Sequence, residues 1–133
     1  MKTVETVSFI LIKDNKVLVE RRRLDRRNDP GAVVVPGGHV EPGETHQEAL
    51  RREMKEELCL EGSEFRFFDR MLCESTTEYQ MNHWYICEDW EGVPNPTEAE
   101  EVFYIGGDEL HKLSLPYDKA VLTKLFHMAI DRA

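Results

Sequence analysis

The sequence has few cysteines and no long apolar segment. Its three cysteines, Cys59, Cys73 and Cys87, are odd in number and show no CxxC spacing, so they indicate neither a disulfide framework nor a thiolate zinc site. No apolar run approaches the ~20 residues that a transmembrane helix needs. The N-terminus lacks the charged and then apolar layout of a signal peptide. These absences favour a cytoplasmic protein without a membrane partner.

An excess of basic residues is also missing. The chain has 17 Lys and Arg against 26 Asp and Glu, which gives a net charge of −9. This balance argues against binding to the phosphate backbone of a nucleic acid polymer. With 133 residues, of which 41% are hydrophobic, the chain fits a single domain, 1–133, with a sizeable core. We find no repeat, linker or low-complexity tract.

Hydrophobic patterning predicts an α/β chain with strands on both sides of a central helix. Gly37 and Gly38 are expected to open a loop whose backbone approaches a ligand closely. Residues 77–81 are expected to connect two strands, and Pro116 begins a closing helix with apolar positions at helical spacing. Apolar and β-branched runs predict strands at 3–12, 17–22, 32–35, 64–76, 82–88 and 102–105.

Three acids on the central helix point to a metal site. Glu53, Glu56 and Glu57 stand at positions i, i+3 and i+4, so a helix directs all three carboxylates to one side. Like charges at this spacing repel by a few tenths of a kcal/mol per pair. A divalent cation bound between the carboxylates would make the cluster favourable, because Mg²⁺ is usually bound by carboxylates together with substrate phosphates. The sequence therefore predicts a metal-dependent enzyme acting on a phosphate compound.

The helix itself has clear start and packing signals. Thr45 is expected to be the N-cap, with Glu48 three residues on completing a capping box. Arg52 stands four residues from both Glu48 and Glu56, so we expect it to pair with two carboxylates along the helix. The buried stripe is expected to consist of residues at four-residue spacing: Leu50, Met54 and Leu58.

Five arginines fall within seven residues at the end of the second strand: Arg21, Arg22, Arg23, Arg26 and Arg27. One interpretation is a solvated basic loop. The other is that an arginine at the strand end binds a substrate phosphate, because guanidinium and phosphate match in a fork geometry. We favour Arg22 over Arg21 for this role, although a one-residue change of register would exchange their faces.

Residues 38–60 contain a pattern that spans the glycine loop and the helix. It resembles the Nudix box, G-x5-E-x7-R-E-U-x-E-E-x-G-U, in which U is aliphatic. Met54 and Leu60 fill the U positions, and every other fixed position matches except the last glycine, which is Cys59 here. The resemblance implies an α/β fold of the Nudix type, an α/β/α sandwich with a central mixed β-sheet.

The resemblance also implies hydrolysis of a nucleoside diphosphate linked to a group X, assisted by Mg²⁺ or Mn²⁺. The MutT-like form of this activity converts a (deoxy)nucleoside triphosphate to the monophosphate and pyrophosphate. Alternative substrates are ADP-ribose, a dinucleoside polyphosphate or a nucleotide sugar. A catalytically silent nucleotide sensor is a further alternative, which the intact acid cluster argues against. The expected partner is a small-molecule nucleotide, bound by a monomer or homodimer.

Roles for individual residues follow from the resemblance by position. The helix acids would be metal ligands, joined by the backbone carbonyl of the loop glycine. An earlier acid would support the site, and the arginine beside the ligands would orient them. The residues so implied are Gly38, Glu44, Arg52, Glu53, Glu56 and Glu57.

MutT-like members also take an acid from the loop before the last strand. Glu98, Glu100 and Glu101 compete for this role, and a solvated acidic loop is the plain alternative. The segment that starts at Trp90 and ends at Glu98 looks most like the MutT-like arrangement. We therefore choose Glu98 as the loop ligand and keep Glu101 as the alternate.

Two positions depart from the family pattern. Cys59 replaces a glycine that ends the helix, where a residue with Cβ in the left-handed conformation costs ~1–2 kcal/mol; we expect its thiol to be buried rather than reactive. Asp118 follows Pro116 and Tyr117 where members that read oxidised guanine have Asn. An aspartate can also read a base edge, as acceptor or donor according to its protonation.

The histidines show no metal-ligand spacing such as HExxH. We expect them to be structural or superficial, with the one inside the glycine loop as the position of most interest. They are His39, His46, His83, His111 and His127.

Overall fold

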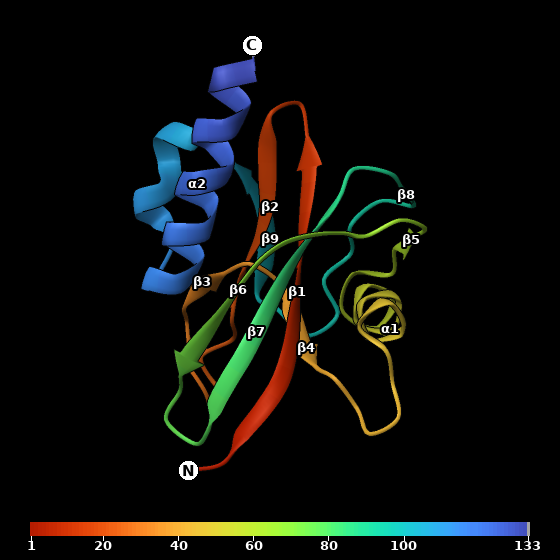
Figure 1. Cartoon of the computed structure of the whole chain (residues 1–133), viewed down its shortest axis with the longest axis vertical. Helices are drawn as coiled ribbons and strands as arrows, with labels where there is room; N and C mark the ends of the chain where they lie inside the picture. Colours follow the sequence, from red (N-terminus) through yellow and green to blue (C-terminus); the bar gives the residue numbers. More distant parts are fainter. Residues whose placement is uncertain (133) are drawn as a thin grey trace.

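A computed structural model describes the backbone of residues 1–132 and the side chains of residues 1–128. A mixed sheet in the order β3-β2-β1-β7-β6 forms the centre, with β4 paired to β1 and β9 paired to β2. Helix α1 covers one face and α2 the other (Figure 1). The elements are β1 Thr3–Lys13, β2 Lys16–Arg21, β3 Val33–Val34, β4 Gly37–His39, α1 His46–Leu58, β5 Glu61–Gly62, β6 Arg66–Glu74, β7 Tyr79–Cys87, β8 Trp90–Glu91, β9 Glu101–Ile105, the 3₁₀ helix η1 Gly107–Lys112 and α2 Pro116–Arg132.

Strand alternation divides the core into two layers. β1 pairs with β7 in parallel and with β2 in an antiparallel manner, and successive side chains on each strand point to opposite faces. Val7, Phe9 and Leu11 pack with the buried side of α1. Ile10 and Trp84 pack in the second cluster, which includes residues of α2. The α/β/α sandwich predicted from the sequence is confirmed.

The start of α1 follows the predicted capping chemistry. The Thr45 hydroxyl accepts a hydrogen bond from Glu48 N (3.1 Å), and the Glu48 carboxylate accepts one from Thr45 N (2.9 Å). The predicted apolar stripe is buried at Leu50, Met54 and Leu58. Cap and stripe together fix the rotation of the helix, and so the direction in which its acids point.

Two segments expected to be irregular are paired with β1. Residues 79–81 belong to β7 because Tyr79 is paired with Thr3, which extends the parallel ladder beyond the predicted start. The glycines before α1 form the short strand β4, in which Gly38 pairs with Val7. Both expectations were wrong for the same reason: strand pairing with a distant segment overrides weak local propensity.

Cys59 adopts the left-handed conformation, with φ 58° and ψ 33°, directly after Leu58. Its backbone N–H donates to Lys55 O (3.1 Å), so the helix ends where a glycine would end it and the strain of a Cβ is retained. The expectation of a buried thiol is wrong, because Cys59 is exposed.

None of the helices in the described part of the chain is long and apolar enough to span a membrane.

Candidate active site

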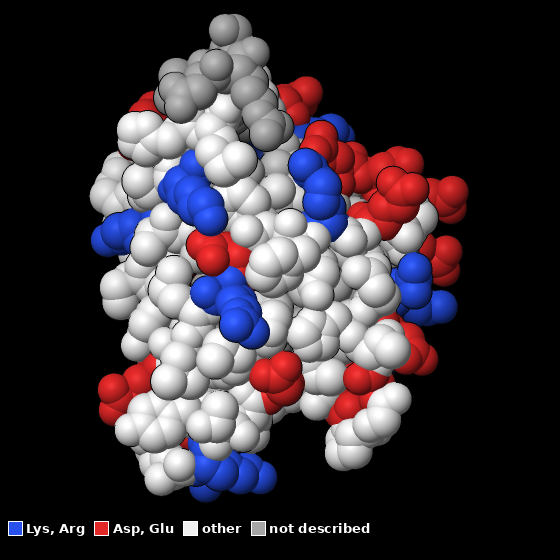
Figure 2. All heavy atoms as spheres, in the orientation of Figure 1, with Lys and Arg blue, Asp and Glu red and all other residues white. Residues whose placement is uncertain are grey.

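A cavity of about 440 Å³ opens between the acidic side of α1, the sheet and the start of α2. One end is lined by carboxylates and arginines, and the other by the polar residues of β1 and β7 together with the first turn of α2. Figure 2 shows acidic side chains gathered on the side of the molecule where α1, β5 and β8 lie. The cavity brings together Arg22, Gly38, Arg52, Glu53, Glu56, Glu57, Glu98 and Asp118.

Glu57 lines the acidic end of the cavity. Its Oε2 atom is buried and has no hydrogen-bond partner among the described residues. Burial raises the pKa of Glu57 strongly, and the negative charges of Glu20, Glu53 and Glu98 raise it further. A buried carboxylate oxygen without a donor is unfavourable by itself, so this atom calls for a proton or a cation.

Glu20 belongs to this cluster, although the sequence reasoning did not include it. It lies on β2, is 6% exposed and lines the same cavity. Burial raises its pKa, while Arg22 and Arg26 act in the opposite direction. The signal was available in the strand pattern: Glu20 shares a face with Leu18, which packs against the α1 side of the sheet.

Gly38 lies directly against the Glu53 carboxylate. A Cβ added at Gly38 would overlap all three atoms of that carboxyl group. Only glycine therefore lets β4 come this close to α1. The Glu53 side chain is 12% exposed, and burial raises its pKa although Arg52 opposes the shift. The predicted neighbourhood of loop glycine and helix acid is present.

Arg52 connects the loop to the helix acids. It donates two hydrogen bonds to Glu44, at 2.7 and 2.9 Å, and one to Glu53 at 2.8 Å. A further bond reaches the backbone O of His39 (2.9 Å), and a longer one reaches Glu56 (3.3 Å). The bonds from Arg52 lower the pKa of Glu44 to about 2. The arrangement keeps both Arg52 and Glu44 charged.

One expected partner of Arg52 is corrected by the structure. Glu48 pairs with the backbone of Thr45 at the helix start, so its carboxylate serves the capping box. Glu44, eight residues before Arg52, takes that place.

The side chain of His39 points to Glu78, with its Nε2 2.5 Å from Oε2, and so pairs away from the acid cluster.

The arginines at the end of β2 separate into two groups. Arg22 lines the cavity, where its Nε donates to Asn28 O (2.9 Å), and burial together with Arg26 lowers its pKa. Arg21 points elsewhere and pairs with Glu101 at 3.0 Å. The geometry therefore agrees with the choice of Arg22 over Arg21 as the arginine beside the acids.

The loop before β9 brings Glu98 to the same cavity. Thr97 donates its backbone N–H to Glu57 O (3.0 Å) and its hydroxyl to Glu56 O (2.6 Å), which holds the loop against the end of α1. Glu98 lines the cavity and lies 3.5 Å from Arg26. Glu101 pairs on the outside with Arg21, so the geometry favours Glu98 over Glu101.

The far end of the cavity is a polar floor closed by α2. The Asp118 carboxylate accepts hydrogen bonds from Val35 N (3.0 Å) and Trp84 Nε1 (3.1 Å). Burial raises the pKa of Asp118 to about 6. On the floor, Thr6 and Asn82 form a hydrogen bond of 2.7 Å. Thr6 and Asn82 were not predicted, because the sequence does not give the register between β1 and β7.

The donor set suits a hard divalent cation. The acidic end offers the carboxylates of Glu20, Glu53, Glu57 and Glu98, of which Glu57 has an oxygen without a partner in the described chain. Oxygen-only ligands are those that Mg²⁺ and Mn²⁺ prefer. The protein therefore belongs to the class of α/β/α sandwich proteins in which a glycine-containing segment and the helix that follows it form an acidic site suited to a divalent cation.

The family follows from comparison with known proteins. The NUDIX domain model matches residues 2–126, so the chain belongs to the Nudix family, whose members act on pyrophosphate bonds. An 8-oxo-dGTP diphosphatase of Haemophilus influenzae is 25% identical over 130 residues, 98% of this chain and 93% of that protein. The 8-oxo-dGTP diphosphatase of Escherichia coli is 30% identical over 94 residues, 71% of this chain and 72% of that protein. The solution structure of the E. coli ORF135 protein has a TM-score of 0.85 at 26% identity, covering 99% of this chain and 94% of that one.

Proposed function

We propose that this Nudix hydrolase converts a (deoxy)nucleoside triphosphate to the monophosphate and pyrophosphate, with Mg²⁺ or Mn²⁺ held by the acids of α1. The observation that supports this most directly is the buried, unpartnered Oε2 of Glu57 inside a cluster of acids. Such a cluster is unfavourable without a cation.

Glu53, Glu56, Glu57 and Glu98 would hold the cation, together with the carbonyl of Gly38. A bound divalent ion neutralises phosphate oxygens and lowers the pKa of a bound water. Glu20 was not in the ligand set implied by the family pattern, and its place beside Glu57 makes it a candidate to accept a proton from the attacking water. In this scheme, Arg52 and Glu44 orient Glu53 and do not contact substrate.

Arg22 and Arg26 would bind the phosphates. Arg22 is half-buried at the acidic end of the cavity, and Arg26 lies beside Glu98. The acids repel the negative phosphates of the substrate, and a guanidinium in this position would offset that repulsion. It would also hold the diphosphate by two parallel hydrogen bonds. The pyrophosphate would then lie between the cation and the arginines.

The polar floor and Asp118 would receive the base. Above a pH of about 6 the Asp118 carboxylate is ionised, so it can only accept hydrogen bonds and favours a base edge that donates one. Two relatives that cover most of the chain are 8-oxo-dGTP diphosphatases.

The catalytic proposal is tested by assaying a panel of nucleotides with Mg²⁺ for pyrophosphate and for orthophosphate separately. We expect pyrophosphate release by the wild type, and a loss of at least ~100-fold in kcat for Glu57→Gln. Glu64→Gln is the matched control, because Glu64 is exposed and lies outside the cavity. Equal rates for Glu57→Gln and the control would refute the assignment.

The base assignment is tested by substrate selectivity. We expect Asp118→Asn to change the ratio of kcat/KM between 8-oxo-dGTP, dGTP and dCTP, because Asn replaces one of the two acceptor oxygens by an NH2 donor. Thermal unfolding of the same variant measures what the bonds to Val35 and Trp84 contribute. An unchanged ratio in a folded variant would show that Asp118 supports the fold alone.

A further inference from the structure

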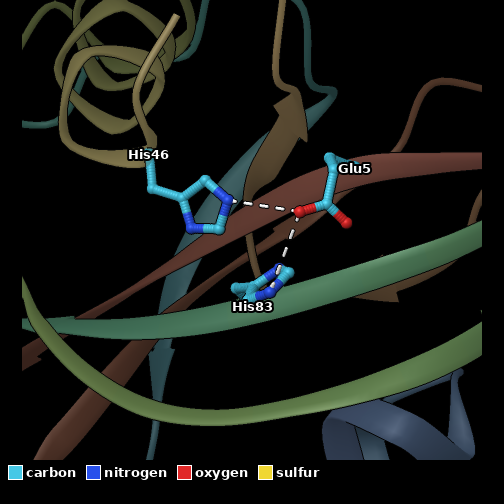
Figure 3. A group of neighbouring side chains, drawn as sticks. All are labelled: Glu5, His46 and His83. Atoms are coloured by element: carbon cyan, nitrogen blue, oxygen red, sulfur yellow. Dashed lines mark ion pairs between the residues drawn. The ribbon is translucent and has the colours of Figure 1, made fainter.

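A second group of potential ligands lies on the α1 face of the sheet, opposite the face that carries the polar floor of the cavity. Glu5 of β1, His46 at the start of α1 and His83 of β7 point toward one another (Figure 3). One oxygen of Glu5 lies 3.4 Å from His46 Nε2 and 3.9 Å from His83 Nε2, and the three potential ligand atoms are all within 4.8 Å of one another. The neighbouring residues Thr6 and Asn82 line the cavity, so strand alternation directs the side chains of Glu5 and His83 to the face opposite the polar floor.

We propose that Glu5, His46 and His83 form a binding site for a transition-metal cation such as Zn²⁺, separate from the carboxylate site of α1. Two imidazole nitrogens and one carboxylate favour Zn²⁺, Co²⁺ or Ni²⁺ over Mg²⁺. Bond lengths of about 2.0–2.1 Å place tetrahedral ligands ~3.3 Å apart. The Glu5 to His46 distance of 3.4 Å already matches this spacing, and rotation of the half-exposed Glu5 side chain would shorten the 3.9 Å distance.

The other nitrogen of each histidine has a polar neighbour. His83 Nδ1 lies 3.4 Å from the backbone O of Thr6, and His46 Nδ1 lies 2.9 Å from the hydroxyl of Tyr85. An Nδ1–H that donates to these oxygens leaves the lone pair of Nε2 free, directed at Glu5. Ligating histidines are usually held in this way, and the contact fixes the ring and its tautomer.

Exposure leaves room for a further ligand. The side chains of Glu5, His46 and His83 are 51%, 27% and 9% exposed, respectively. The site is thus open on the side of Glu5, where a water could complete four-coordination. His83 and His46 are held by the sheet and the capped helix, so little ordering is required when the cation binds.

A cation at this site would join three segments that are far apart in the sequence. It would connect the first residue of α1 to β1 and to β7. We therefore expect Zn²⁺ to stabilise the fold without contacting a nucleotide. This inference does not depend on the proposed function, because none of its three residues lines the cavity.

The test is a titration of the full chain with Zn²⁺ in excess Mg²⁺, which competes with Zn²⁺ for the carboxylate site. Isothermal calorimetry gives affinity and stoichiometry, and Co²⁺ absorption in the visible range reports nitrogen ligation. We expect one Zn²⁺ site in the wild type, at least tenfold weaker in His46→Gln and in Glu5→Gln. These partly exposed positions are chosen over the buried His83, whose replacement could unfold the protein.

Two matched variants separate the sites. His111→Gln removes an exposed histidine of η1 and should bind Zn²⁺ as the wild type does, and Glu57→Gln should also retain this site. Two-dimensional NMR of the histidine rings should show perturbation of His46 and His83 on addition of Zn²⁺. Binding that is unchanged in His46→Gln and Glu5→Gln, or lost in Glu57→Gln, would overturn the proposal.

Discussion

Glu57→Gln should stabilise the metal-free protein while it abolishes catalysis. Oε2 of Glu57 is buried without a hydrogen-bond partner in the described chain, close to the negative charge of Glu20. Gln has nearly the same shape and no proton to lose, so the substitution removes the cost of keeping this carboxyl protonated in the folded state without leaving a cavity. When the replacement of a residue increases stability but removes activity, the residue serves function at the expense of stability.

The size of the effect follows from proton linkage. The ordinary pKa of 4.5 for this carboxyl applies to the unfolded chain, and burial raises the folded value far above it. From pH 4.5 upward the folded state keeps a proton that the unfolded state has lost, so stability falls by up to ~1.4 kcal/mol per pH unit. At a pH near 7 the limit is about 3 kcal/mol, which corresponds to roughly 10–12 °C in Tm.

The assay is thermal unfolding in EDTA between about pH 4.5 and 8, followed by circular dichroism. The Tm values of the wild type and of Glu57→Gln should coincide at the acidic end of this pH range. They should diverge as the pH rises, with the higher Tm for the variant. Mg²⁺ should then stabilise the wild type more than the variant. Glu56→Gln is the control, because the Glu56 side chain is 55% exposed and should shift stability by less than ~0.5 kcal/mol. Parallel pH curves for wild type and Glu57→Gln would refute the reasoning.

Three further predictions follow from the same geometry. Gly38→Ala should displace the Glu53 carboxylate, weaken Mg²⁺ binding at least tenfold and cost about 1–3 kcal/mol, as measured by metal titration of kcat and by urea unfolding. Cys59→Gly should relieve the left-handed strain and stabilise by about 1 kcal/mol in urea; a destabilised variant would contradict this. Glu44→Gln should cost about 2–3 kcal/mol at neutral pH by weakening the bonds from Arg52. Because the folded-state pKa of Glu44 is lowered, this difference should disappear as pH falls from 4.5 toward about 2, and a constant difference would count against the ion pair.

The parts of the site that lie on α1 could be predicted because their signals are local. Thr45 and Glu48 define the cap, and spacing of three and four residues sets the acids on one side. Strand parity predicts that Arg21 and Arg22 point to opposite faces, but it does not say which of them faces the cavity, because that depends on the register. Within such segments, each residue's direction depends only on neighbours a few positions away.

The parts that were missed depend on pairing between distant segments. The ladder that aligns Val7 with His83 joins residues 76 positions apart, and no local pattern specifies it. Glu5 and His83 therefore look unrelated in the sequence, as do Thr6 and Asn82 on the cavity floor. The two-residue strands β5 and β8 are too short for any period to be read.

The ladder between β1 and β7 also limits how a cation at Glu5 could act on catalysis. Thr6 and Asn82 line the cavity, whereas Glu5 and His83 face α1, so a cation there would not touch a bound nucleotide. The remaining route is His46, which begins α1 seven residues before Glu53, about 10 Å along the helix axis. A helix anchored by its cap and apolar stripe transmits little displacement over that distance. We therefore expect Zn²⁺ at this site to raise Tm while kcat, measured with saturating Mg²⁺, changes by less than about twofold.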